Sequence, residues 1–346
     1  MRRLARISAA LLSLCIVAIA VVSVQVNRFM NQPLTVPDSG YAFEIAAGKS
    51  FASVSRDLVA SGLIEDDRWF RWYARWKNKT GSIQAGDYLI EPGTTPTLLL
   101  KQFTSGAVRM YTFTLVEGWN YREVLQGLRA NDAIDATMSD EDWPALLQKL
   151  GAQVTHPEGL FLPETYNFPR RTTDKVILAQ AYALMQSVLD EEWNARSDDA
   201  PVNSAYEALS LASIVEKETA RADERAKIAG VFTRRLDQHM RLQTDPTVIY
   251  GIGSAFDGNL TRRHLKTDTT YNTYTRHGLP PTPIAMPGRA AINAALNPAQ
   301  GNELYFVATG LGDGSHQFSA TKAEHDAAVA QYLRRLREQR RARSRL

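Results

Sequence analysis

The amino-acid sequence predicts an α+β protein in which an N-terminal transmembrane helix precedes two β-α-α-β modules and a mixed α/β lobe. Three observations lead to this class. A long uncharged run lies near the N-terminus, a pattern of strand then helix occurs twice, and longer helical patterns mixed with short strands follow. The 346 residues are 44% hydrophobic, which is enough for two or three domains with cores of their own.

The uncharged run covers residues 7–26, which is long enough to cross a bilayer as a helix. Arg2, Arg3 and Arg6 precede it, so the positive-inside rule places residues 1–6 in the cytoplasm and the chain after Val26 outside. The alternative is a cleaved signal peptide with a weak processing site at 18–20. The run continues past that site, which favours a single-pass anchor that stays in place.

Cysteine, histidine and net charge exclude several classes of function. Cys15 is the only cysteine and lies inside the predicted span, so no disulfide or thiol chemistry is expected outside the membrane. The six histidines are scattered, and no metal site is predicted. A net charge of +3 gives no field for binding nucleic acid. Arginines crowd a basic tail at 334–346, which is typical of a frayed helix end.

After a polar linker at 27–40, two segments align at an offset of seventy positions, from Tyr41 and from Tyr111. Each alternates like a short strand, turns at a glycine and then changes to helical spacing. The first is expected to close with a return strand after Gly86, and the second with one after Gly159. Two β-α-α-β modules in tandem, at 41–110 and near 111–166, account for this pattern.

Each module resembles the LysM-like modules, a small fold often used on cell-wall glycans. The resemblance is one of pattern, so the first module is either a glycan-binding module or a spacer. Trp69, Trp72 and Trp76 recur at helical spacing within it. Such a stripe is usually part of a core, and stacking on sugar rings is the alternative.

A glutamate occupies an unusual position in the segment 204–219, which reads as a helix. Ser204 and Glu207 have the spacing of a capping box, and Leu211, Ile214 and Val215 continue at core spacing. The next position on that face is Glu218. A carboxyl group on an apolar face, near the negative end of the helix dipole, is favoured in its protonated form, as a general acid requires. The alternative is a solvated helix end.

Several distinctive motifs follow one another between residues 115 and 307. They are Leu115–Gly118, Glu158–Tyr166, Leu211–Thr219, Arg241–Gly251, Tyr271–Tyr274, Gly278–Pro281, Ile284–Gly288 and Leu304–Val307. In these motifs the chain resembles the YceG-like family, the endolytic murein transglycosylases of the MltG type. The resemblance implies a catalytic domain at 111–333 that includes the second module.

This resemblance implies cleavage of the β-1,4 bond between N-acetylmuramic acid and N-acetylglucosamine in peptidoglycan. The muramic acid's own C6 hydroxyl is the nucleophile, so a 1,6-anhydro end forms. A tethered nucleophile makes one carboxyl group sufficient, whereas a hydrolase usually needs two. By its place in the motif, Glu218 carries the catalytic role: it protonates the departing oxygen and then takes the proton of the C6 hydroxyl. No cofactor is implied.

Seven further side chains are predicted to contact the substrate: Gln243, Thr244, Asp245, Tyr271, Asn272, Tyr274 and Glu164. The first three precede Pro246, which biases Asp245 toward an extended loop, and they could instead cap their own backbone. The tyrosines and Asn272 combine aromatic faces with an amide, although their hydroxyls could equally be buried at a strand edge. Glu164 is expected to wall the cleft.

Two other functions remain open on the sequence alone. One is a peptidoglycan hydrolase in which Asp245 or Glu164 activates water, and the other is a wall-binding scaffold without catalysis. The resemblance implies an enzyme of the inner membrane that faces the periplasm and cuts nascent strands near the bilayer, ending chain elongation. Peptidoglycan synthases and penicillin-binding proteins are its expected partners by association.

Overall fold

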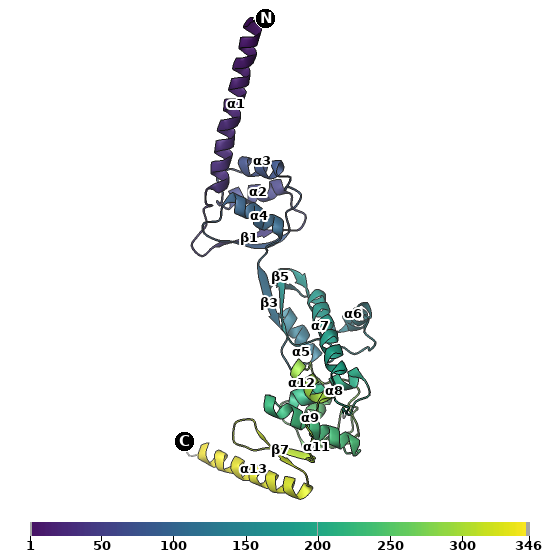
Figure 1. Ribbon diagram of the computed structural model, residues 1–346. Coiled ribbons are helices and arrows are strands. Elements are labelled where there is room, and N and C mark those ends of the chain that lie inside the picture. Colours follow the sequence, from purple (N-terminus) through teal and green to yellow (C-terminus); the bar gives the residue numbers. More distant parts are fainter. Residues whose placement is uncertain (1, 199, 344–346) are drawn as a thin grey trace. The chain divides into compact units, whose positions relative to one another are not determined.

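The computed structural model describes residues 2–198 and 200–343. It confirms a mixture of helices and strands with one apolar helix at the N-terminus (Figure 1). The chain divides into two compact units, which are described separately. The first comprises the residues up to Tyr111 together with Asn167–Arg171, and the second comprises Thr112–Tyr166 and the residues from Thr172 onward.

The first unit contains the apolar helix and the first repeat. In chain order its elements are α1 (Arg2–Asn31), β1 (Tyr41–Ile45), α2 (Phe51–Ala60), α3 (Arg68–Trp76), β2 (Gly86–Ile90) and α4 (Pro96–Ser105). Strands β1 and β2 pair antiparallel, with Tyr41 opposite Ile90 and Ile45 opposite Gly86. The order β1-α2-α3-β2 follows from the alternation and helical spacing of the sequence, and α4 is added after it.

Helix α1 is long and apolar enough to cross a membrane over Ala10–Asn31. It continues beyond Val26, where the sequence suggested that a linker begins. Val26 and Met30 are buried in the core of the first unit, and Leu34 in the following segment is buried there too. The region 27–40 therefore packs as part of the unit, because its few apolar side chains fall where they cover the core.

The core of the first unit lies between the β1–β2 sheet and the helices. Phe103 of α4 is fully buried; it stacks on Phe43 at 5.7 Å and meets the edge of Tyr88 at 4.8 Å. Helix α4 begins at Pro96 behind the N-cap Thr95, whose side chain accepts the Leu98 N–H. The cap fixes where the helix starts and so which of its side chains reach the core.

The second repeat differs from the first between its two helices. Its elements are β3 (Met110–Thr114), α5 (Tyr121–Arg129), β4 (Ile134–Asp135), the 3₁₀ turn η1 (Asp140–Asp142), α6 (Trp143–Lys149) and β5 (Thr165–Pro169). Strand β3 pairs with β5, while the extra strand β4 pairs in parallel with β6 (Thr172–Thr173). The return strand begins at Thr165 rather than near Gly159, because the intervening Phe161 and Leu162 are buried in irregular backbone.

Helices form most of the remainder of the second unit. They are α7 (Asp174–Asn194), α8 (Ala205–Glu218), α9 (Ala222–Asp237), α10 (Asp245–Ile252), the 3₁₀ turn η2 (Gly253–Ala255), α11 (Arg262–Lys266) and α12 (Arg289–Leu296). Helix α8 contacts α7, α9, α10 and α12. All its residues from Ala208 to Val215 are buried, so α8 is the central helix of the unit.

A hairpin and a last helix complete the second unit. Strands β7 (Tyr305–Ala308) and β8 (His316–Ser319) pair antiparallel around a turn that contains Gly310, Gly312 and Gly314. Helix α13 (Lys322–Arg343) contacts both strands. It runs through most of the region 334–346 that was expected to be a basic tail, and residues 344–346 lie outside the described part of the chain.

Neighbouring leucines on α4 allow the packing of the first unit to be tested. Leu99 is fully buried, whereas Leu98 is 54% exposed. Replacing Leu99 with Ala should lower the free energy of unfolding of this unit by about 2–5 kcal/mol, because it removes apolar contact and leaves a cavity. Leu98→Ala, the matched control, should change it by no more than about 0.5 kcal/mol. Hydrogen exchange of the β1–β2 amides in the full-length protein measures both, and equal effects would contradict the assigned packing.

Candidate active site

Glu218 is the last residue of α8, so its carboxyl group lies at the negative end of the central helix. The start of the helix is as expected at Ser204, whose hydroxyl accepts the Glu207 N–H at 3.2 Å. The return bond of the capping box differs: the Glu207 carboxylate accepts the N–H of Asn203 at 2.7 Å. The cap still sets where α8 begins, and its length then places Glu218 at the far end.

The carboxyl group of Glu218 is partly buried and bonded to a threonine. The hydroxyl of Thr244 donates to Glu218 Oε1. Burial raises the pKa of Glu218, and the neighbouring Asp245 carboxyl raises it further, while the Thr244 bond lowers it. Burial outweighs the hydrogen bond, so Glu218 holds its proton to a higher pH than an ordinary glutamate. This is the property that a general acid requires near neutral pH.

Thr244 is held by a segment that comes from elsewhere in the chain. Its N–H donates to Thr273 Oγ1 at 3.1 Å, and the preceding Gln243 N–H donates to the Thr273 carbonyl at 3.2 Å. Gln243 has a left-handed backbone with φ 50°, an uncommon state for a residue other than glycine. Its side chain is exposed beside Thr244. The strained residue and the two bonds fix the direction of the Thr244 hydroxyl toward Glu218.

Asp245 begins α10 and is not in an extended loop, since the extended residue is its neighbour Thr244. Pro246 occupies the first turn, where its missing N–H costs nothing. The exposed Asp245 carboxylate accepts the hydroxyl of Tyr274 at 2.6 Å. Burial, then the bond to Asp245, raises the pKa of Tyr274, so its hydroxyl stays protonated and remains a donor. Asp245 and Tyr274 are thereby paired beside Glu218.

Asn272 has a different role from the expected direct contact with sugar. It is fully buried, and its side-chain N–H groups donate to the carbonyls of His264, Leu265 and Thr267. Its Oδ1 accepts the N–H of Tyr274 at 2.8 Å. Each polar atom of the amide is thus bonded to backbone, and Asn272 positions Tyr274.

Glu216 provides a comparison with Glu218, because burial also raises its pKa. Its Oε2 accepts the N–H of Gly288 at 3.0 Å, and its Oε1 lies 3.8 Å from the guanidinium of Arg225. Burial alone therefore does not separate the two glutamates. The difference is that Glu216 ties α8 to the start of α12, whereas Glu218 faces the polar group of Thr244 and Asp245.

His316 and Glu224 form a pair near Glu218 that the sequence did not reveal. The buried Glu224 carboxylate accepts the His316 N–H at 3.0 Å and lies 2.7 Å from its Nδ1. His316, at the start of β8, is largely buried. With the buried Arg235, it acts on Glu218 electrostatically and favours the charged carboxylate. Nothing in the sequence linked these residues, which lie ninety-two positions apart.

A second buried carboxyl group, Glu158, was also missed. Its side chain accepts the N–H of Tyr121 at 3.1 Å and the hydroxyl of Tyr250 at 2.9 Å. The ring of Tyr271 meets Tyr250 edge-on at 4.9 Å, so this predicted residue belongs to the Glu158 group. Burial raises the pKa of Glu158 to about 8. The next residue, Gly159, is held at φ 77°, and a Cβ there would lie 2.5 Å from Pro283, so the close approach of these two segments requires glycine.

Glu164 stands apart from both groups. Its side chain is exposed and accepts the N–H of Thr165 at 2.8 Å, next to the β3–β5 sheet. The structure thus brings Glu218, Thr244, Asp245 and Tyr274 together, with Gln243 adjacent. Among the described residues, no group of three or more His, Cys, Asp or Glu side chains is placed to hold a metal ion.

Comparison with known proteins is consistent with this arrangement. The model of the YceG-like family matches residues 43–331. The chain belongs to the YceG-like family. It is 30% identical over 306 residues to the endolytic murein transglycosylase of Bacillus subtilis, covering 84% of each chain. It is 28% identical to the protein of that name from Streptococcus pneumoniae D39, covering 84% of this chain and 58% of the relative.

Solved structures give the same result for this YceG-like chain. A crystal structure described as a yceG-like protein from Listeria monocytogenes matches with a TM-score of 0.53 and 27% identity. The match covers 84% of this chain and 99% of the other.

The high pKa of Glu158 makes stability depend on pH. The folded protein keeps this proton up to about pH 8, whereas an unfolded glutamate releases it near 4.5. Stability from this group is therefore full below about pH 4.5 and is lost as pH rises through 8. Glu158→Gln imitates the protonated form, so the variant should lose less thermal stability than wild type between about pH 5 and pH 9. Melting curves of the full-length protein in detergent measure this, and parallel losses would show that Glu158 is not the responsible group.

Proposed function

We propose that this protein is an endolytic lytic transglycosylase that cuts the bond between N-acetylmuramic acid and N-acetylglucosamine in peptidoglycan. The observation that carries the proposal is the partly buried carboxyl group of Glu218, whose pKa is raised and which lies on a motif of the YceG-like family. Relatives named endolytic murein transglycosylases support it. The product is a 1,6-anhydro end on the muramic acid.

The reaction needs one group that first gives and then takes a proton. Protonated Glu218 donates to the glycosidic oxygen as the bond to C1 of the muramic acid breaks. The carboxylate that results removes the proton from the C6 hydroxyl as its oxygen bonds to C1. The Thr244 hydroxyl stabilises this carboxylate, and His316 and Arg235 favour the same charge. The chain thus supports both protonation states of one residue.

A hydrolase that uses the same acid is the second candidate, and the position of Asp245 favours it over a wall-binding scaffold without catalysis. The exposed Asp245 carboxylate lies close enough to Glu218 to raise its pKa, and Tyr274 orients it. It is therefore better placed than Glu164 to activate water. Such an enzyme would leave reducing muramic acid ends in place of anhydro ends.

The cellular setting completes the proposal. The apolar helix α1 is consistent with a single-pass membrane anchor. We place the N-terminus in the cytoplasm and the two units in the periplasm, with the β-α-α-β modules acting as LysM-like glycan contacts. The substrate is then the nascent strand near the bilayer, whose elongation the enzyme ends, and the partners are peptidoglycan synthases and penicillin-binding proteins.

Replacing Glu218 with Gln should lower strand cleavage by about 10²–10⁴-fold, because it removes a general acid and base and keeps the shape. Glu216→Gln is the matched control two residues earlier; it keeps the oxygen that accepts the Gly288 N–H and should retain activity. Digests of purified glycan strands are analysed by mass spectrometry. Wild-type protein should produce anhydro ends, whereas reducing ends would favour the hydrolase. A Glu218→Gln protein as active as wild type would contradict both mechanisms.

Replacing Thr244 with Val should move the pH profile of cleavage. The hydroxyl bond favours charged Glu218, so its loss raises the pKa of that carboxyl group. Cleavage requires the protonated form, and activity therefore falls as pH rises through this pKa. The falling limb should shift upward by about 1–2 pH units, the equivalent of a hydrogen bond to a charged group. A downward shift, or a fall in rate at every pH with no shift, would contradict this role of Thr244.

A further inference from the structure

Helix α3 presents two tryptophans to its surroundings from a small, well-packed unit. Phe70 and Ala74 are fully buried and attach the helix to the core. On the outer face Trp72 is 47% exposed and Trp76 is 64% exposed, and their rings stack with centroids 6.1 Å apart. Two large aromatic side chains exposed next to each other are typical of a surface that contacts another molecule.

The same face carries a cluster of positive charge. Arg75, Lys77 and Lys79 are exposed and, among the residues that the structure describes, form no ion pair. The Lys77 ammonium lies 4.3 Å from the centre of the Trp76 ring, so charge and aromatic surface are interleaved. Arg75 lies in α3 beside the tryptophans, and Lys77 and Lys79 come directly after the end of the helix at Trp76. Tryptophan close to lysine and arginine is typical of segments that lie in the interfacial layer of a membrane.

The position of α3 along α1 supports a membrane as the partner. Helix α1 contacts α3 and α4, and the carbonyl of Met30 accepts the Thr97 hydroxyl of α4 at 2.8 Å. Val24 is 67% exposed on α1, whereas Val26 is 5% and Met30 is 2% exposed. The side chains of α1 therefore change from exposed to buried within six residues, which is about 9 Å of helix. That distance is slightly longer than the depth of one headgroup layer, which is roughly 5–8 Å.

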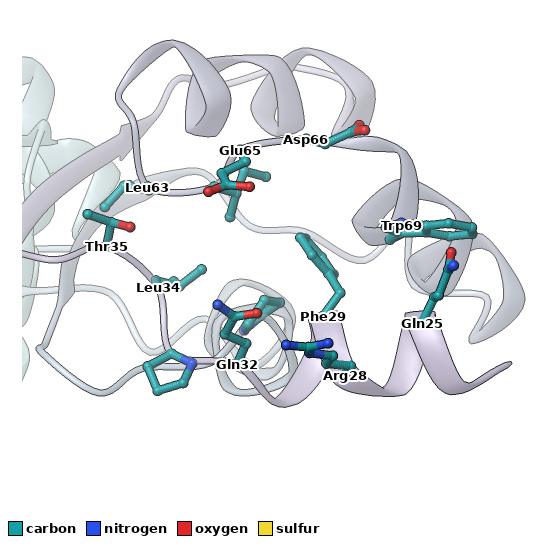
Figure 2. A pocket seen from close by; sticks show the side chains of 13 residues that line it. Gln25, Arg28, Phe29, Gln32, Leu34, Thr35, Leu63, Glu65, Asp66 and Trp69 are labelled. Carbon is teal, nitrogen blue, oxygen red and sulfur yellow. The ribbon is translucent and has the colours of Figure 1, made fainter. Parts of the chain in front are cut away.

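A cavity shows how closely the two helices approach. It has a volume of about 370 Å³ and is lined by Gln25, Arg28 and Phe29 from α1 and by Trp69 from α3. Figure 2 shows Trp69 and Gln25 at one end of this cavity, with Phe29 and Arg28 along its lower wall. The first turn of α3 thus lies beside the segment of α1 where the exposed apolar side chains end.

We propose that α3 lies in the headgroup layer of the membrane that α1 crosses and binds anionic phospholipid. Trp72 and Trp76 contact the boundary of the acyl chains, and Arg75, Lys77 and Lys79 contact lipid phosphates. This inference rests on α1 being a membrane anchor, as stated under the proposed function. Binding of α3 to the headgroup layer would hold the first unit at a fixed angle to the bilayer. Sugar stacking explains the tryptophans but not the cationic helix held at the base of the anchor.

Spin labels at three sites of the full-length protein test the proposal in vesicles of phosphatidylcholine and phosphatidylglycerol. The native Cys15 reports the anchor, Trp76→Cys in a Cys15→Ser background reports α3, and Ala42→Cys in that background is the control. Ala42 is exposed on β1, which Figure 1 shows at the end of the unit away from α1. The measurement is the accessibility of each label to oxygen, which concentrates in lipid, relative to a water-soluble nickel complex.

The label at 76 should have a ratio several-fold higher than the label at 42, and Cys15 should have the highest. A ratio at 76 equal to that at 42, while Cys15 reads lipid and the same vesicles cut glycan strands, overturns this inference alone. A water-exposed Cys15 overturns the anchor instead. Protection of the label at 76 by added glycan strands, without any lipid effect, would assign the face to sugar.

A charge-reversed variant tests the part played by anionic lipid. With Arg75, Lys77 and Lys79 changed to Glu, the label at 76 should become several-fold more accessible to the nickel complex in these vesicles. In vesicles of phosphatidylcholine alone, the reversal should have a much smaller effect. An unchanged label in the anionic vesicles overturns the recognition of anionic phospholipid.

Discussion

The burial of α8 on all its sides determines the chemistry at its end. The segments packed around the end of α8 leave the carboxyl group of Glu218 largely buried, where its charged form is costly. The Thr244 hydroxyl offsets part of that cost without removing it. The geometry of Thr244 in turn depends on Gln243 and Thr273, which makes the acid site a product of two distant segments.

Three glutamates of the second unit show that a raised pKa does not by itself identify a catalytic group. Glu158 is the most deeply buried of them, and tyrosine and backbone donors surround it. The side chain of Glu216 is also buried, and it ties α8 to the start of α12 through the Gly288 N–H. Glu218 accepts the hydroxyl of Thr244 and lies beside Asp245, whose exposed carboxylate is paired with Tyr274. Function is therefore assigned by neighbours as well as by burial.

The apolar helix α1 and the first unit are joined by packing. The core of the unit takes in the end of α1, and the carbonyl of Met30 accepts the Thr97 hydroxyl of α4. This packing fixes the direction of α1 relative to the rest of the unit, and α3 lies beside the contact.

The sequence by itself determined the apolar N-terminal helix and the β1-α2-α3-β2 order, because both follow from local composition and periodicity, and it singled out Glu218 as the candidate acid from its place on a helix face and in a motif. It could not determine which side chains meet across long separations. The Glu224–His316 pair, the Tyr250 donor of Glu158 and the use of Asn272 as a backbone clamp all depend on tertiary packing. Packing also decided that α1 extends into the core of the first unit, since the burial of Val26 and Met30 is supplied by residues far away in the chain.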